Sequence, residues 1–174
     1  MSNMDVAAYN RAGQLFTACN QSAATVTLIN TSTATGFILS NPYGSAVKLL
    51  IVDANFTYTT APTAIATVFL AGSIAPSVTA HATVTALGVY GADGSGANGL
   101  AKGRAYNAST TPNLPVYIRA LGNPQITVAG SAMVTMPWTM EGCLVLVPGS
   151  YMQISYIGQA PVGMTSMTWA EVPA

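Results

Sequence analysis

The sequence predicts an all-β protein, an antiparallel β-sandwich of about ten short strands with a jelly-roll-like arrangement. Short segments rich in Val, Ile, Thr and aromatic residues alternate with turns built from Gly, Pro, Asn and Ser. The longest of these segments shows the two-residue alternation of a strand. No stretch shows the helical period, and the Ala-rich segments carry Thr, Val, Pro and Gly, which lower helix propensity.

Two parts of the chain are expected to differ in structure. Residues 1–12 have no strand pattern and are predicted to form an N-terminal arm. Residues 13–174 are predicted to form a single β-sandwich domain, because a chain of 174 residues suits one hydrophobic core. Its strands are predicted at 14–19, 24–30, 36–40, 46–59, 65–71, 84–90, 103–107, 116–121, 126–134, 143–147, 151–158 and 166–172.

The longest predicted strand, 46–59, follows a turn at 41–45 in which Pro presets φ and Gly permits positive φ. Its first half is predicted to be covered on both faces and its second half to be solvated on one. One face is assigned Leu50, Val52, Ala54, Phe56 and Tyr58, and the other begins with Val47, Leu49 and Ile51 before changing to Asp53, Asn55 and Thr57.

Charge is scarce. The chain has five basic and five acidic residues, so 6% of it is charged and its formal net charge is zero. An average soluble domain is about 25% charged. A monomer of this mass has roughly 8,000 Å² of surface. We expect Thr, Ser and Asn to cover part of that surface and other subunits to bury another part, since near-zero net charge favours association.

The same composition excludes several partners. Five dispersed basic residues make no basic patch, so neither nucleic acid nor an anionic membrane is an expected partner. Although 51% of the residues are apolar and mean hydropathy is +0.44, no run of 18 apolar residues predicts a membrane-spanning helix.

Few residues could carry chemistry. His81 is the only histidine, so a Ser-His-Asp, Cys-His or histidine-zinc site would have to use it, yet no acidic residue stands in 79–83. Glu141 and Glu171 are the only glutamates and would serve glycoside hydrolysis only if they faced one cleft. We expect His81 to be an ordinary loop or strand residue and both glutamates to be solvated charges at strand ends.

The remaining motifs are weaker. The Gly-rich segment 91–99 has oxygen-bearing side chains around Asp93 but lacks the closing glutamate of a calcium loop, so a surface loop is expected. Cys19 and Cys143 are expected to be free, buried thiols, with a disulfide as the alternative. The N-x-[ST] sequons at Asn20, Asn30, Asn55 and Asn107 are expected by chance in a chain so rich in Ser and Thr. Trp138 and Trp169 are expected to pack in the core or in interfaces, and stacking on carbohydrate is the alternative.

Two stretches carry distinctive turn and strand motifs. The first is 36–51, with Asn41-Pro42-Tyr43-Gly44-Ser45 at its centre; the second joins 147–151 to the ending 164–173, which reads Met164-Thr165-Ser166-Met167-Thr168-Trp169-Ala170-Glu171-Val172-Pro173. Together they resemble small β-rich virion proteins of tailed bacteriophages. The resemblance covers a minor part of the chain. It implies a jelly-roll-like fold, a homotrimer and attachment to a capsid or tail, without catalytic residues.

We therefore expect a non-enzymatic structural protein located in the virion, a capsid decoration (cement) protein that binds the assembled shell and stabilises it. Expected partners are two further copies of the chain, as a homotrimer, and the major capsid protein or another virion protein. The arm at 1–12 is expected to reach a neighbour. No catalytic, cofactor-binding or metal-binding residue is predicted. A head fibre, tail or adaptor protein and a carbohydrate- or receptor-binding module are the alternatives.

Overall fold

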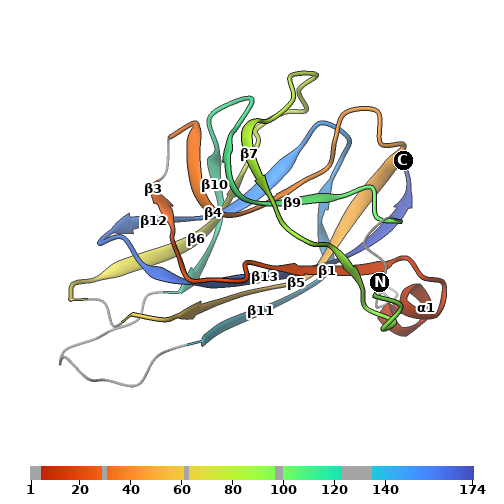
Figure 1. The fold of residues 1–174 in the computed structure, drawn as a ribbon, viewed down its shortest axis with the longest axis horizontal. Coiled ribbons are helices and arrows are strands. Elements are labelled where there is room, and N and C mark those ends of the chain that lie inside the picture. Colours follow the sequence, from red (N-terminus) through yellow and green to blue (C-terminus); the bar gives the residue numbers. More distant parts are fainter. Residues whose placement is uncertain (1–4, 29–30, 61–62, 97–99, 123–134) are drawn as a thin grey trace.

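The computed structural model describes residues 5–28, 31–60, 63–96, 100–122 and 135–174. Within these residues the chain forms two β-sheets packed face to face, which confirms the predicted sandwich (Figure 1). The described part contains thirteen strands where the sequence predicts about ten, and one short helix. The strand predicted at 126–134 lies outside the described residues.

The strands divide between a six-stranded and a seven-stranded sheet. The first has the order β11-β5-β13-β1-β8, with β2 beside β13, and comprises β1 (Leu15–Cys19), β2 (Ala24–Thr25), β5 (Val47–Tyr58), β8 (Tyr90–Gly91), β11 (Thr135–Leu146) and β13 (Val162–Pro173). The second has the order β10-β6-β12-β4-β9-β7, with β3 beside β12, and comprises β3 (Thr27–Leu28), β4 (Thr33–Ser40), β6 (Ala66–Gly72), β7 (Ala82–Ala86), β9 (Arg104–Thr110), β10 (Val116–Gly122) and β12 (Tyr151–Gly158).

Eight of the strands have jelly-roll connectivity. Among them the first pairs with the last (β1 with β13), the second with the seventh (β4 with β12), the third with the sixth (β5 with β11) and the fourth with the fifth (β6 with β10). All four pairs are antiparallel, and the chain crosses between the sheets as it follows this order. This is the pattern of a long hairpin rolled into two packed sheets.

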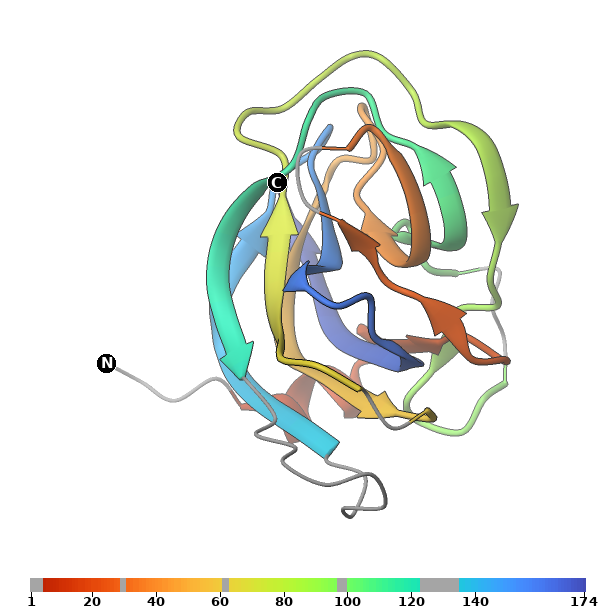
Figure 2. The same ribbon diagram turned by 90° about the vertical axis from the view of Figure 1, so that its left-hand side faces the viewer.

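The segment 73–115 is an insertion into that jelly roll, between its fourth strand β6 and its fifth strand β10. It adds β9 and then β7 beyond the edge strand β4 of one sheet, and β8 beyond the edge strand β1 of the other. Figure 2 shows the result, with β7 (yellow-green) and β10 (teal) at opposite sides of the molecule. The insertion therefore replaces one edge of the seven-stranded sheet with a new strand, β7.

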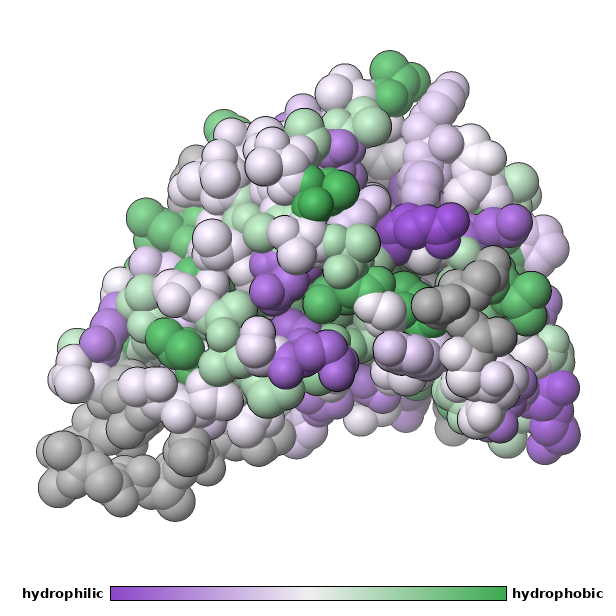
Figure 3. Space-filling model, viewed as in Figure 1, coloured by the Kyte–Doolittle hydropathy of each residue, from purple (hydrophilic) through white to green (hydrophobic). Residues whose placement is uncertain are grey.

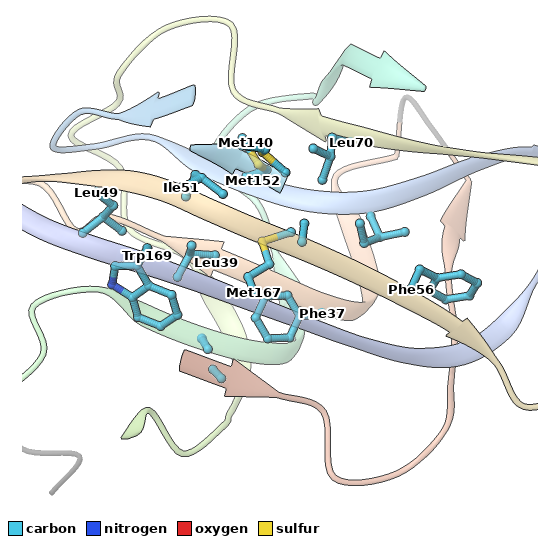
Figure 4. Close-up of a cluster of buried hydrophobic side chains, with 14 of the residues drawn as sticks. Phe37, Leu39, Leu49, Ile51, Phe56, Leu70, Met140, Met152, Met167 and Trp169 are labelled. Carbon is cyan, nitrogen blue, oxygen red and sulfur yellow. The ribbon is translucent and has the colours of Figure 1, made fainter. Parts of the chain in front are cut away.

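The core lies between the two sheets. Trp169 on β13 is fully buried and its ring lies 6.4 Å from that of Phe16 on β1. Figure 4 shows how Leu49 and Ile51 from β5 gather with Trp169 and with side chains of β4 in this layer. Burial of each large apolar side chain contributes about 1.5–3 kcal/mol, and most of the largest fully buried side chains of the described residues belong to this layer.

The face assignment within β5 is partly wrong. Leu49 and Ile51 point into the main core, as Ala54 does three residues later, so the buried face changes at Val52. The cause is an irregularity in the pairing with β13, where Trp169 is opposite Ile51 but Thr168 is opposite Asp53, which leaves Val52 as the extra residue. The prediction that the first half of β5 is covered on both faces is correct, because Val52 packs in a second cluster on the outer side.

The predicted N-terminal arm packs against that outer cluster. The predicted arm contains one short helix that the sequence pattern does not indicate, α1 (Val6–Arg11). It begins at the N-cap Asp5, whose carboxylate accepts a hydrogen bond from the Ala8 amide at 2.9 Å. Val6 and Tyr9 of this helix pack against Leu15, Val52 and Ala170. The described part of the arm thus covers the outer face of its own sheet.

Candidate functional site

The insertion folds back over the outer face of the seven-stranded sheet. The Ser77 amide donates to the Gly149 carbonyl at 3.0 Å, and the Tyr151 hydroxyl donates to the Asn113 carbonyl at 2.6 Å. Gly149 has φ +87°, and a Cβ there would lie 2.7 Å from the Ser77 carbonyl oxygen. Only glycine allows the insertion to approach the β11–β12 turn this closely.

A cavity of about 270 Å³ opens between the insertion and the turn that follows β4. Seven of its thirteen lining residues have polar side chains, and none of the thirteen has a formal charge. The residues that matter below are Ser40, Tyr43, Thr79, His81, Val84 and Tyr106. We call this cavity the insertion pocket.

His81 lies half-buried at the insertion pocket. Its Nδ1 is 2.7 Å from the Ser109 hydroxyl, and its ring lies 5.5 Å from that of Tyr106 and 5.3 Å, edge-on, from that of Tyr151. Burial lowers the pKa of His81, so the neutral imidazole is favoured. The Ser109 hydroxyl also lies 3.1 Å from the Thr110 carbonyl, and the tautomer of His81 decides which of the two groups donates in the His81–Ser109 hydrogen bond.

Ser109 is 2% exposed, and none of the residues that line the insertion pocket has a carboxylate side chain. The His81–Ser109 pair therefore lacks the exposed nucleophile and the orienting acid of a Ser-His-Asp site. The sequence predicts His81 as an ordinary residue and misses its role in packing. Its partners are 25 to 70 residues away along the chain, so no local pattern reveals them.

The prediction that Glu171 is a solvated charge at a strand end is wrong. Its side chain is buried at 6% exposure on β13. Its carboxylate accepts hydrogen bonds from the Lys102 amide at 2.9 Å, the Gly103 amide at 2.8 Å and Trp169 Nε1 at 3.2 Å. These bonds fix the start of β9, so Glu171 anchors the insertion to the jelly roll.

The other acidic candidates remain on the surface. Glu141 is exposed in an irregularity of β11, with φ 48°, so the two glutamates differ in environment. Asp93 accepts a hydrogen bond from the Ser95 amide at 2.9 Å, and its hydrogen bonds to the Ser95 side chain and backbone lower its pKa. Across the described residues, no group of three His, Cys, Asp or Glu side chains is arranged to hold a metal ion.

The edge strand β7 is the second notable feature. All five of its residues are exposed, and none is charged or Pro. Two other edges are better protected against pairing: β11 carries Pro137 and Glu141, and β8 has only two residues. On β10 the Arg119 guanidinium lies 4.1 Å from the Trp138 ring centre. Like β10, β7 pairs irregularly with its neighbour, around Thr83 with φ 50°.

Apolar residues are also exposed elsewhere. The total accessible surface is 8245 Å², close to that of a compact monomer of this mass. Ile74, Val78 and Leu114, all in the insertion, are 75%, 73% and 54% exposed. Figure 3 shows weakly polar and apolar residues over most of one face, with strongly hydrophilic residues in small separate groups.

The remaining candidates differ in burial. Trp169 is a core residue, as expected, and Trp138 is half-buried beneath Arg119. Cys19 and Cys143 are free thiols; Cys143 is exposed rather than buried, and burial raises the pKa of Cys19. Among the sequons, Asn20 is 1% exposed and its amide donates to the Ser22 carbonyl at 2.7 Å, whereas Asn30 lies outside the described residues.

No protein-family model matches the chain, and no curated protein or solved structure is significantly similar to it. In the part of the chain that the structure describes, no helix is long and apolar enough to span a membrane.

Proposed function

We propose that this protein is a non-enzymatic structural protein that works as a homo-oligomer, with β7 as the strand through which copies join. The observation that carries the proposal is the exposure of all of β7 without one charged residue or proline. The unpaired amides and carbonyls of such an edge are a template for a further strand, which proteins normally block by charge, proline or cover.

Directions within the sheet permit this pairing between copies. From β10 to β7 every neighbour is antiparallel, so β10 and β7, at opposite edges, run in opposite directions. A strand that pairs antiparallel with β7 can therefore be β7 of another copy, in a two-fold contact, or β10 of another copy, in a contact between opposite edges. A homotrimer requires the second, heterologous type of contact, because a two-fold contact closes as a dimer.

Surface composition supports self-association over other partners. Formal net charge is zero, so copies do not repel one another over long range. Exposed apolar residues such as Ile74 and Val78 accompany β7 in the same insertion. Nucleic acid and anionic membranes would require a basic patch that five dispersed basic residues do not provide.

We further propose that the oligomer is a homotrimeric capsid decoration protein located in the virion. Two observations support this proposal. The first is the set of turn and strand motifs at 36–51 and 164–173. The second is the jelly-roll fold, an architecture common in viral shells, although the same fold also carries other functions. The partner of the homotrimer would then be the major capsid protein, bound on the assembled lattice.

Light scattering at several concentrations tests the oligomer. The wild type is expected to have a concentration-independent mass near three protomers. Thr85→Lys, which places a charge on the exposed edge, is expected to yield monomers, and the matched variant Thr85→Ser is expected to behave as the wild type. A wild-type monomer at all concentrations would contradict the proposal.

Co-sedimentation tests the capsid role. Wild-type protein is expected to pellet with assembled phage capsids in a fixed ratio and to leave free capsid subunits unbound. A wild-type trimer that never pellets with capsids would retain the oligomer and exclude the decoration role.

A further inference from the structure

We propose that the insertion pocket is a binding site for one neutral sugar residue. The pocket includes Val84 of β7, but it offers side chains to a ligand where the edge of β7 offers backbone groups. The proposal does not rest on oligomer formation.

The lining selects for a neutral ligand. None of the thirteen lining residues is Asp, Glu, Lys or Arg, so neither an anion nor a cation would find a countercharge there. His81 adds no charge at neutral pH, because burial lowers its pKa. A charged ligand would have to leave water without compensation.

The polar groups in the pocket suit hydroxyls. Ser40, Thr79, Tyr43 and Tyr106 each bring a hydroxyl that can both donate and accept a hydrogen bond. In the described part of the chain, none of these four hydroxyls has a hydrogen bond to another protein group. A polyol, whose own hydroxyls donate and accept, matches such a lining better than an aliphatic ligand would.

The apolar groups suit the C–H face of a sugar ring. Tyr43 is 67% exposed at the pocket, so a face of its ring is open to a ligand. Val78 and Val84 line the same cavity, and the rings of His81 and Tyr106 are held 5.5 Å apart beside it. Aromatic side chains combine apolar area with a polar tip, the pairing that a sugar residue requires.

Size limits the ligand to one residue. The cavity of about 270 Å³ lies below the roughly 300–1,000 Å³ of sites that enclose drug-sized ligands. A single pyranose ring, free or at the end of a glycan, is the unit that fits. A ligand of so few atoms is expected to bind with a dissociation constant on the order of 1 mM.

Titration of the ¹⁵N-labelled protein with methyl glycosides of glucose, galactose, mannose and N-acetylglucosamine tests the proposal. At least one is expected to cause saturable shifts at Tyr43, Thr79 and His81. Tyr43→Ala is expected to weaken that binding about tenfold through loss of the ring face. The matched variant Tyr90→Ala removes another exposed tyrosine, on β8 of the other sheet, and is expected to leave binding unchanged.

Three results would overturn the proposal. They are the absence of saturable shifts with all four glycosides, shifts that Tyr43→Ala and Tyr90→Ala affect equally, and shifts at pocket residues caused by the peptide Ala-Val-Ala but by none of the sugars. The last result would assign the pocket to an apolar segment of a protein. Thr79→Val provides a second variant, which keeps the shape of the side chain and removes its hydroxyl, and it is also expected to weaken binding.

Discussion

The Glu171 carboxylate accepts a 2.8 Å hydrogen bond from the Gly103 amide, which joins the last strand of the jelly roll to the returning strand of its insertion. The Lys102 amide lies 2.9 Å from both oxygens of the same carboxylate. The insertion carries β7 and most of the insertion pocket, so this buried carboxylate supports both proposed sites. A fixed frame that carries its functional groups on an added segment is a common arrangement.

Glu171→Gln is expected to destabilise the fold by about 1–3 kcal/mol. The glutamine side chain keeps only one acceptor oxygen, and its NH₂ group would face the backbone N–H groups of Lys102 and Gly103, which are themselves donors. Chemical denaturation followed by tryptophan fluorescence measures this change. Glu141→Gln, at an exposed position, is expected to change stability by less than about 0.5 kcal/mol. Equal effects from the two variants would show that Glu171 is not the anchor.

Asn41 is expected to be the most sensitive polar residue of the β4–β5 turn. It is fully buried, and its amide nitrogen donates to the Val47 carbonyl at 2.8 Å and the Leu146 carbonyl at 2.9 Å. Asn41→Asp removes both donors and buries a carboxylate beside two carbonyls, with an expected cost of about 3 kcal/mol or more. Ser45→Ala removes only the hydroxyl that donates to Asn41 and should cost about 1 kcal/mol in the same denaturation experiment.

Gly149 and Gly44 provide a matched pair for the docking of the insertion. Both have positive φ, +87° and +79°, but a Cβ at Gly44 would meet nothing within 4 Å whereas one at Gly149 would meet Ser77. Gly44→Ala is expected to cost about 1–2 kcal/mol from backbone strain alone. Gly149→Ala is expected to cost more and to speed amide exchange at Ser77, and equal costs would mean that the insertion does not press on this turn.

Stability is expected to fall as the pH drops below about 6.5, the pKa of an unfolded histidine. Burial lowers the folded-state pKa of His81, so between the two pKa values the unfolded chain binds more protons and gains stability relative to the fold. The loss is complete once the pH has passed below the folded pKa. Melting temperatures at pH 7.5 and pH 5 measure it, and His81→Phe, which keeps a ring between Tyr106 and Tyr151, is expected to remove most of this difference. A variant with the same pH dependence as the wild type would rule out His81 as its source.

Local patterns predict most of the strands because each strand carries its own alternation and turn residues. β12 lies where Tyr151–Gly158 was expected, and β5 and β13 differ from their predicted ranges by a few residues. Helix α1 escapes prediction because six residues are too few for a period, and it depends on the Asp5 cap and on a surface formed by distant strands. The bulge at Val52 likewise depends on the partner strand and leaves no mark in β5 itself.

The candidate sites were less predictable than the fold. The burial of Glu171 depends on amides 68 and 69 residues away, and His81 meets Ser109 and Tyr151 only after the insertion folds back. The strand predicted at 84–90 forms at Ala82–Ala86 instead, and whether it becomes an edge depends on the whole sheet order. The shortage of charge in the sequence predicts association but does not predict the surface through which copies would join.

Hydrogen–deuterium exchange of the amides in Ala82–Ala86 tests the central claim most directly. If copies pair through β7, exchange in this strand is slower in the wild-type oligomer than in the monomeric Thr85→Lys variant, and Thr85→Ser retains the slow exchange. Equally fast exchange of these amides in an assembled oligomer and in its dissociated chains would contradict the account, because copies would then join through another surface.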